Sequence, residues 1–196
     1  MSAQKPASWA YSEEFITETE VIEKARARGE ELGCAPVMPG AGAALRLLAA
    51  AVNAKAVVEV GTGAGVSGLW LMSGMPSDGI LTTIDVEAEH QRAARAAYAS
   101  AGIASQRTRV ITGRGLDVLP RLTDGAYDMV VIDAEKTEYP LYVEQALRLL
   151  AAAAGAKAVV EVGTGAGVSG LWLMSGMPSD GILTTIDVEA EHQRAA

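Results

Sequence analysis

The sequence predicts an α/β fold in which helices are wound on both faces of a parallel β-sheet. Three observations lead to this prediction. Short runs rich in Val, Ile and Thr alternate with longer helix-forming segments along most of the 196 residues. One such run passes directly into a glycine-rich turn and then a helix, a pattern typical of sheets that bind ligands at their carboxyl edge. The chain is 49% hydrophobic but only 5% aromatic, so the core must consist mainly of aliphatic side chains.

The segment before the first strand predicts a helical cap. Residues 12–32 are charged, with apolar side chains interspersed, and predict one surface helix or two short ones. Residues 33–42 contain two prolines and three glycines, which predict a loop. We therefore expect residues 1–43 to form a cap on the rest of the chain.

The remaining elements alternate between helices and strands, beginning with a helix at 43–54. The predicted strands share a β-branched or aliphatic composition and lie at 56–60, 79–85, 107–112, 127–133, 156–162 and 181–187. The helices expected between them lie at 65–75, 87–101, 116–122 and 139–154. Pro140 is compatible with the last of these because it falls in the first turn. With right-handed crossovers, the simplest doubly wound sheet has the strand order 3-2-1-4-5-6, the Rossmann order.

Charge and composition exclude several classes of partner. The formal net charge is −8 and no basic run is present, which argues against nucleic acid or an anionic membrane as a partner. No apolar run reaches the roughly 18 residues that a membrane helix needs, and the first residues lack the apolar core of a signal peptide. The single cysteine, Cys34, excludes an internal disulfide and a cysteine zinc site. We expect a cytoplasmic protein that acts on a small molecule.

The sequence of residues 44–94 occurs a second time at residues 146–196, 102 positions later. Only two residues differ, because Val52 and Asn53 are replaced by Ala154 and Gly155. An old tandem repeat would have accumulated more differences, so we interpret the chain as a chimera made by engineered or recombined segment duplication. We expect one domain over 1–196, with a core at 44–145 and a duplicated βαβ segment at 146–196.

The glycine-rich turn of the first copy predicts a ligand site. In "VVEVGTGAG" the glycines at 61, 63 and 65 permit a tight turn and close approach of a ligand to the backbone. Asp85 ends the next strand, where its carboxylate can accept hydrogen bonds from ribose hydroxyls. This pattern leaves open a nicotinamide dinucleotide or S-adenosylmethionine. Glu59 favours the second, because a carboxylate would repel a pyrophosphate and suits an ammonium group.

The pattern "ExGxGxG" at 59–65 resembles motif I of the class I S-adenosylmethionine-dependent methyltransferases. The wider sequence, from "VMPGAGAALRLL" to "YDMVVIDAEKTEYPLYVEQALRLL", resembles the catechol and caffeoyl-CoA O-methyltransferases, and most of all their mycobacterial-type members. The resemblance covers residues 12 to about 150 and implies S-adenosylmethionine as cofactor. The cofactor-binding residues that it implies are Val37, Glu59, Gly61, Thr62, Gly63, Gly65, Ser67, Asp85, Val86 and Glu135.

The same resemblance implies a catalytic metal, usually Mg²⁺, that holds two adjacent oxygens of a catechol-like substrate. Asp133 matches the first metal ligand, and Lys136 matches the residue that assists deprotonation of the hydroxyl. The family takes further ligands from an Asp-Asn pair after its fifth strand, where this sequence has Gly163 and Thr164. We therefore expect an incomplete metal site and weak or absent methyl transfer. The family also suggests a homodimer and the strand order 3-2-1-4-5-7-6, which the duplicated segment is expected to change.

The second glycine-rich loop has the same local chemistry as the first but a different expected place in the sheet. No reversal of strand order lies beside it, so we expect it to bind no ligand. Two alternatives to a methyltransferase-derived chimera stay open: a non-catalytic folding scaffold, and a module that binds a nicotinamide cofactor. The residues of the second loop that correspond to the first site are Glu161, Gly163, Gly165, Gly167 and Asp187.

Overall fold

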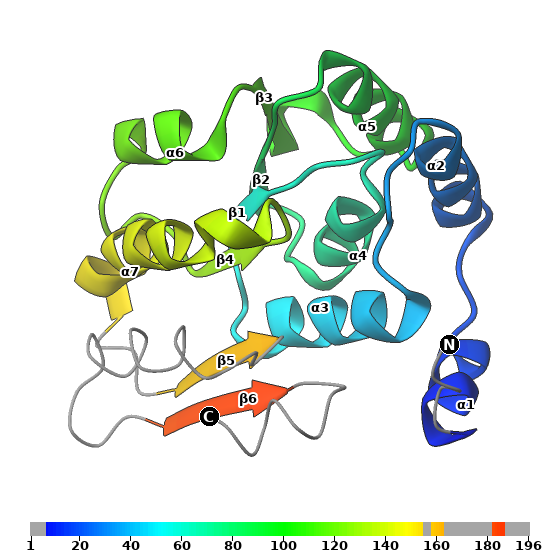
Figure 1. The fold of residues 1–196 in the computed structure, drawn as a ribbon, viewed down its shortest axis with the longest axis horizontal. Helices are drawn as coiled ribbons and strands as arrows, with labels where there is room; N and C mark the ends of the chain where they lie inside the picture. Colours follow the sequence, from blue (N-terminus) through cyan, green and yellow to red (C-terminus); the bar gives the residue numbers. More distant parts are fainter. Residues whose placement is uncertain (1–6, 155–157, 163–181, 187–196) are drawn as a thin grey trace.

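The computed structural model describes residues 7–154, 158–162 and 182–186 (Figure 1). Three helices precede the first strand: α1 (Ala7–Phe15), α2 (Glu20–Glu31) and α3 (Pro39–Ala51). The charged N-terminal segment thus forms two helices, one of the two predicted arrangements. Helix α3 begins four residues earlier than predicted, because Pro39 occupies its first turn, where a missing backbone N–H costs nothing.

Four parallel strands form the main sheet in the order β3-β2-β1-β4. In this sheet Val57 of β1 is in register with Leu81 of β2 on one side and with Met129 of β4 on the other. The four strands follow the first part of the predicted order. Their bounds are β1 (Ala56–Val60), β2 (Ile80–Asp85), β3 (Thr108–Thr112) and β4 (Met129–Ile132).

Helices cover both faces of this sheet, and each face has its own apolar cluster (Figure 1). Helices α2 and α3 join α4 (Val66–Gly74) and α5 (Ala88–Ser100) on one face. The other face carries α6 (Gly115–Val118) and α7 (Tyr139–Ala154). Three short 3₁₀ helices complete the connections: η1 (Ser105–Arg107), η2 (Leu119–Arg121) and η3 (Lys136–Glu138).

Side chains of β1 alternate between these two clusters, as a strand's pleat requires. Val57 belongs to the cluster beneath α4 and α5, whereas Val58 and Val60 belong to the cluster beneath α7. All three are almost completely buried. The doubly wound architecture therefore follows from a central strand that is apolar on both faces.

The second copy contributes β5 (Ala158–Val162) and β6 (Ile182–Ile186). They pair in parallel, with Ala158 opposite Ile182, the same register as Ala56 opposite Ile80 in the first copy. These two strands form a separate two-stranded sheet, so the predicted single sheet with the order 3-2-1-4-5-6 is wrong for this structure. Pairing within a copy is specified by that copy alone, whereas pairing with β4 depends on residues outside it.

No helix in the described parts of the chain combines the length and apolar character that crossing a membrane requires.

Candidate functional site

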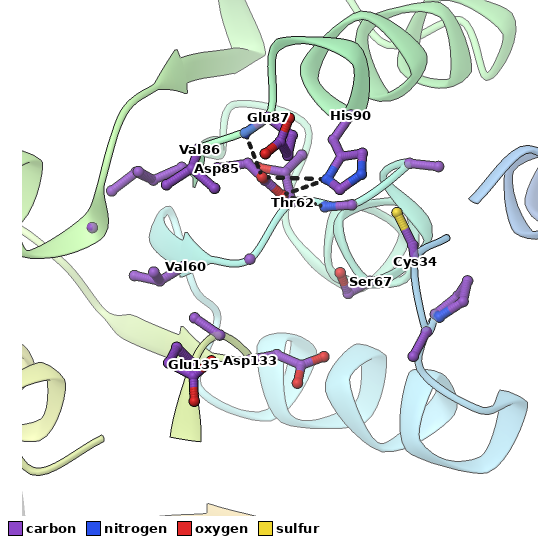
Figure 2. Close-up of a pocket in the computed structure, with 18 of the residues that line it drawn as sticks. Cys34, Val60, Thr62, Ser67, Asp85, Val86, Glu87, His90, Asp133 and Glu135 are labelled. Carbon is purple, nitrogen blue, oxygen red and sulfur yellow. Dashed lines mark hydrogen bonds and ion pairs between the residues drawn. The ribbon is translucent and has the colours of Figure 1, made fainter. Parts of the chain in front are cut away.

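A cavity of about 420 Å³ opens at the carboxyl edge of the main sheet, next to the glycine-rich loop (Figure 2). It lies where the strand order reverses between β1 and β4, the position at which doubly wound sheets bind ligands. Its walls come from the loop before α3, the ends of the four strands and the start of α7. The lining residues are Cys34, Ala35, Pro36, Val37, Val60, Gly61, Thr62, Gly63, Ala64, Val66, Ser67, Ile84, Asp85, Val86, Glu87, His90, Gly113, Arg114, Gly115, Asp133, Ala134, Glu135, Glu138 and Tyr142.

The glycine-rich loop takes a shape that its first glycine makes possible. Gly61 has φ +101°, and a Cβ there would lie 1.9 Å from the carbonyl oxygen of Asp133. Its N–H donates to the carbonyl of Ile84 at 2.8 Å. The loop is therefore held between the ends of β2 and β4, with no space for any side chain at this position.

Asp85 connects the glycine-rich loop to the end of β2. One carboxylate oxygen accepts a hydrogen bond from the Gly63 N–H at 2.9 Å, and the other accepts from the Glu87 N–H at 2.9 Å. The Nδ1 atom of His90 lies 3.3 Å from the second oxygen (Figure 2). Because two carboxylate oxygens together offer about four acceptor positions, Asp85 can still accept a ligand hydroxyl.

Glu59 is not among the residues that line the cavity, and its contact with a ligand stays a prediction. Its side chain is completely buried, and one carboxylate oxygen accepts a hydrogen bond from Thr83 Oγ1 at 2.6 Å. Burial raises the pKa of Glu59 to about 7, and the Ser67 and Thr83 hydroxyls oppose that rise. Strand alternation accounts for this position. Like Val57, two residues earlier, Glu59 faces α4 and α5 rather than the ligand side.

The segment after β4 brings acidic side chains to the cavity. Asp133 and Glu135 line it, whereas Lys136, at the start of η3, is not among the lining residues (Figure 2). Burial raises the pKa of Asp133, and the charge of Lys136 partly opposes that rise. Lys136 is therefore close enough to act on Asp133 electrostatically but does not contribute to the cavity wall.

The described residues do not fit the predicted Mg²⁺ site. They contain no group of three His, Cys, Asp or Glu side chains able to hold a metal ion. A hard cation needs six or more oxygen ligands, of which several usually come from the protein. Asp133 is the single predicted metal ligand among the described residues, which do not by themselves hold a Mg²⁺ ion.

Most of the predicted site residues do converge on this cavity. Those that line it are Val37, Gly61, Thr62, Gly63, Ser67, Asp85, Val86, Asp133 and Glu135. Gly65 does not, because it caps α4 and packs against Ala94 and Tyr98 of α5. With Glu59 and Lys136, it is one of three predicted residues that lie outside the cavity wall.

The sequence did not lead us to a cluster around Arg114 that also lines the cavity. Arg114 forms an ion pair with Glu138, and the Tyr142 hydroxyl donates to the same carboxylate at 2.9 Å. Arg114 follows β3 directly, in the sequence "TGRG". Since the carboxyl ends of parallel strands share one edge, the position of this turn was the available signal.

Acidic side chains outnumber basic ones around the cavity. Arg114 is the one arginine or lysine among its lining residues, and it is paired with Glu138. Such a site favours a cationic ligand and disfavours an anionic group such as a pyrophosphate. The lining carboxylates are Asp85, Glu87, Asp133, Glu135 and Glu138.

The second glycine-rich loop cannot be compared directly with this site. Gly163, Gly165, Gly167 and Asp187 lie outside the described residues. Glu161 lies in β5, where the backbone alone is described. Its predicted lack of a ligand stays a prediction.

Comparison with known proteins identifies relatives of this chain. A family profile described as O-methyltransferase matches residues 12–154 and, a second time, residues 145–196. The "Probable O-methyltransferase" of Mycobacterium tuberculosis (strain ATCC 25618 / H37Rv) is 54% identical over 142 residues. That alignment covers 72% of this chain and 63% of the mycobacterial protein. The chain thus spans less than two thirds of the length of this relative.

Solved structures show the same fold. The O-methyltransferase TomG from Streptomyces achromogenes, in complex with SAM, is 34% identical with a TM-score of 0.66. That match covers 72% of this chain and 65% of TomG. An O-methyltransferase from Bacillus cereus in complex with SAH is 29% identical with a TM-score of 0.67, covering 74% of this chain and 68% of the other.

Proposed function

The chain belongs to the O-methyltransferase family, and on that premise we propose that it binds S-adenosylmethionine, or S-adenosylhomocysteine, beside the first glycine-rich loop. One observation carries the proposal. The cavity at the strand-order reversal combines a glycine turn open to backbone approach with Asp85 and an excess of carboxylates. The complexes of TomG with SAM and of the Bacillus cereus protein with SAH support it.

Different residues of the cavity bind different parts of S-adenosylmethionine in this proposal. Asp85 accepts hydrogen bonds from ribose hydroxyls, and the glycines at 61 and 63 let the ligand approach the backbone closely. The surrounding carboxylates stabilise the positive charges of an ammonium and a sulfonium. When bound, S-adenosylmethionine supplies an electrophilic methyl group. The same negative lining disfavours the pyrophosphate of a nicotinamide cofactor.

Methyl transfer to a catechol-like hydroxyl of a small molecule is impaired in our proposal. Asp133 lines the cavity, but no cluster of metal ligands surrounds it in the described residues. Lys136, the expected aid to deprotonation, does not contribute to the cavity wall. Binding is thus supported more strongly than catalysis.

We also propose that the chain arose by duplication of a segment of one family member. The near-identity of 44–94 and 146–196 supports this origin, as does the second match of the family profile. A duplicated loop does not by itself imply a second site, because the described cavity also takes residues from outside the repeated segment, Asp133 among them.

Calorimetric titration with S-adenosylhomocysteine and with NAD tests the proposed ligand. We expect one S-adenosylhomocysteine per chain and no NAD binding. Asp85→Ala should weaken binding at least about tenfold, since a ligand contact and the tie to Gly63 are both lost. Asp187→Ala is the matched control and should leave the affinity unchanged. Equal losses of affinity in both variants would show that the ligand site is wrongly assigned to the first copy. If neither S-adenosylhomocysteine nor NAD binds, a folding scaffold is favoured.

A further inference from the structure

Four buried side chains form a continuous hydrogen-bonded chain beneath the glycine-rich loop. Gln91 Nε2 lies 3.1 Å from Thr62 Oγ1, which lies 2.6 Å from Thr83 Oγ1. Thr83 Oγ1 lies 2.6 Å from a carboxylate oxygen of Glu59. Each of the four residues is at most 2% exposed. Of the four, Thr62 alone lines the cavity.

The donors and acceptors of this chain can be ordered from its two ends. The Gln91 amide nitrogen can only donate, and Glu59 in its ionised form can only accept, as its carboxylate does from Thr83. A hydroxyl has one hydrogen, so the Thr83 hydrogen is already used. Thr62 must therefore donate to Thr83. The order runs from Gln91 through Thr62 and Thr83 to Glu59, and each hydroxyl in it both accepts and donates.

The chain anchors the loop to three strands at once. Glu59 lies on β1 and Thr83 on β2, while Gln91 of α5 also donates to the carbonyl of Ile111 on β3 at 2.9 Å. Thr62 is the member that belongs to the loop itself. Its hydroxyl therefore ties the loop to the end of the sheet through side chains that do not reach the ligand.

Three buried polar atoms around this chain are already unpaired among the described residues. The second carboxylate oxygen of Glu59, the amide oxygen of Gln91 and the Tyr98 hydroxyl are buried and have no hydrogen-bond partner among the described residues. A broken link would leave further buried polar atoms unpaired, which is costly in a low-dielectric interior. The four side chains are therefore expected to keep the geometry of their hydrogen bonds.

We propose that Glu59, Thr83 and Gln91 are positioning residues that hold Thr62, and with it the glycine-rich loop, in the shape that receives the ligand. None of the three contacts the ligand itself. The effect on affinity rests on the proposed function, whereas the effect on the loop does not. This assigns Glu59 a role that differs from direct ligand contact.

Thr83→Val tests the proposal, because it removes the central hydroxyl and keeps the shape of the side chain. Amide hydrogen exchange should be measured by NMR in the ligand-free protein, since peptides from the two copies have the same mass. Relative to the amides of β1, the amides of Gly61, Gly63 and Gly65 should exchange about tenfold faster. Thr83→Ser retains the hydroxyl and should restore slow exchange. Thr185→Val, the same change in the second copy, should leave the exchange of the first-loop amides and of the β1 amides unchanged.

Titration with S-adenosylhomocysteine gives the second readout. Thr83→Val should weaken binding about tenfold, and Thr83→Ser should recover most of the affinity. If Thr83→Val does not fold, Gln91→Met breaks the other end of the chain and should give the same pattern. Unchanged relative exchange of the loop amides in the folded variants would overturn the proposal. If the unmodified protein binds no S-adenosylhomocysteine, the proposed function fails, while the exchange measurement still decides whether the network positions the loop.

Discussion

The two copies of the repeated segment have nearly the same sequence and the same internal pairing but different surroundings. In each copy the first strand pairs with the second in one register, Ala56 opposite Ile80 and Ala158 opposite Ile182. In the first copy, β4 and β3 flank this pair, whereas β5 and β6 pair only with each other among the described strands. Local sequence is therefore sufficient to specify two strands and their register, but not their place in a larger sheet.

The cavity shows what the surroundings add. Half of its lining residues lie within the repeated segment 44–94, and half lie outside it. The outside half does not belong to the repeated segment, so the repeat alone does not build this cavity. Those residues are Cys34, Ala35, Pro36, Val37, Gly113, Arg114, Gly115, Asp133, Ala134, Glu135, Glu138 and Tyr142.

The largest difference between the copies is expected at the first glycine of each loop. In Gly61→Ala, the new Cβ would meet the carbonyl of Asp133 in a left-handed backbone conformation, so we expect a loss of about 3 kcal/mol in unfolding free energy. Gly163→Ala should cost much less, because Asp133 can pack against one glycine only. Urea unfolding of both variants measures the difference. Equal losses would mean that both loops are packed alike.

A second difference concerns pH and the buried carboxyl of the first copy. Burial raises the pKa of Glu59 from 4.5 to about 7, so the folded state holds a proton that the unfolded state releases above pH 4.5. This contribution is fully present below pH 4.5 and is lost as the pH rises through 7. It amounts to on the order of 3 kcal/mol at most.

Glu59→Gln should remove this pH dependence. The unfolding free energy of the unmodified protein should fall more steeply between pH 5 and pH 7.5 than that of the variant. Glu161→Gln is the matched control, and its profile should follow that of the unmodified protein. Parallel profiles for all three proteins would contradict a raised pKa at Glu59.

The smallest difference is expected on the surface. Lys55 and Asp78 form an ion pair at 3.1 Å, with both side chains more than half exposed. Water screens such a pair, so Asp78→Asn should leave the thermal midpoint unchanged within error. Asp180→Asn, the equivalent change in the second copy, should do the same. A clear shift of the thermal midpoint in one variant alone would contradict this expectation and would show that the two aspartates have different surroundings.

Much of the fold could be predicted from hydrophobic alternation and turn residues. The four strands of the main sheet, their order and the helices between them follow from short aliphatic runs such as 56–60 and 80–85, each followed by a helical segment. The separate pairing of β5 and β6 could not be predicted this way. The rules that order strands assume one sheet. No residue in 156–162 indicates which strand this segment will pair with.

The site divides along similar lines. Gly61 and Asp85 line the cavity, as their positions at the ends of strands indicate, and their contacts with a ligand stay a prediction. Glu59 was assigned to the site for its charge, although strand alternation turns its side chain toward α4 and α5. Arg114 was missed although its turn directly follows β3, whereas Tyr142 reaches the cavity from α7 through tertiary packing, which no local pattern records.

The position of Cys34 has a practical consequence. It is the single cysteine of the chain, it lies in the cavity wall, and it falls outside the repeated segment. A thiol-reactive fluorophore would therefore label one defined place without any engineering and would report on the first loop alone. Burial and the nearby Asp85 charge raise the pKa of this thiol, so labelling proceeds faster in mildly alkaline buffer. Protection of Cys34 by added nucleoside would then measure occupancy of the first site separately from any binding at the second glycine-rich loop.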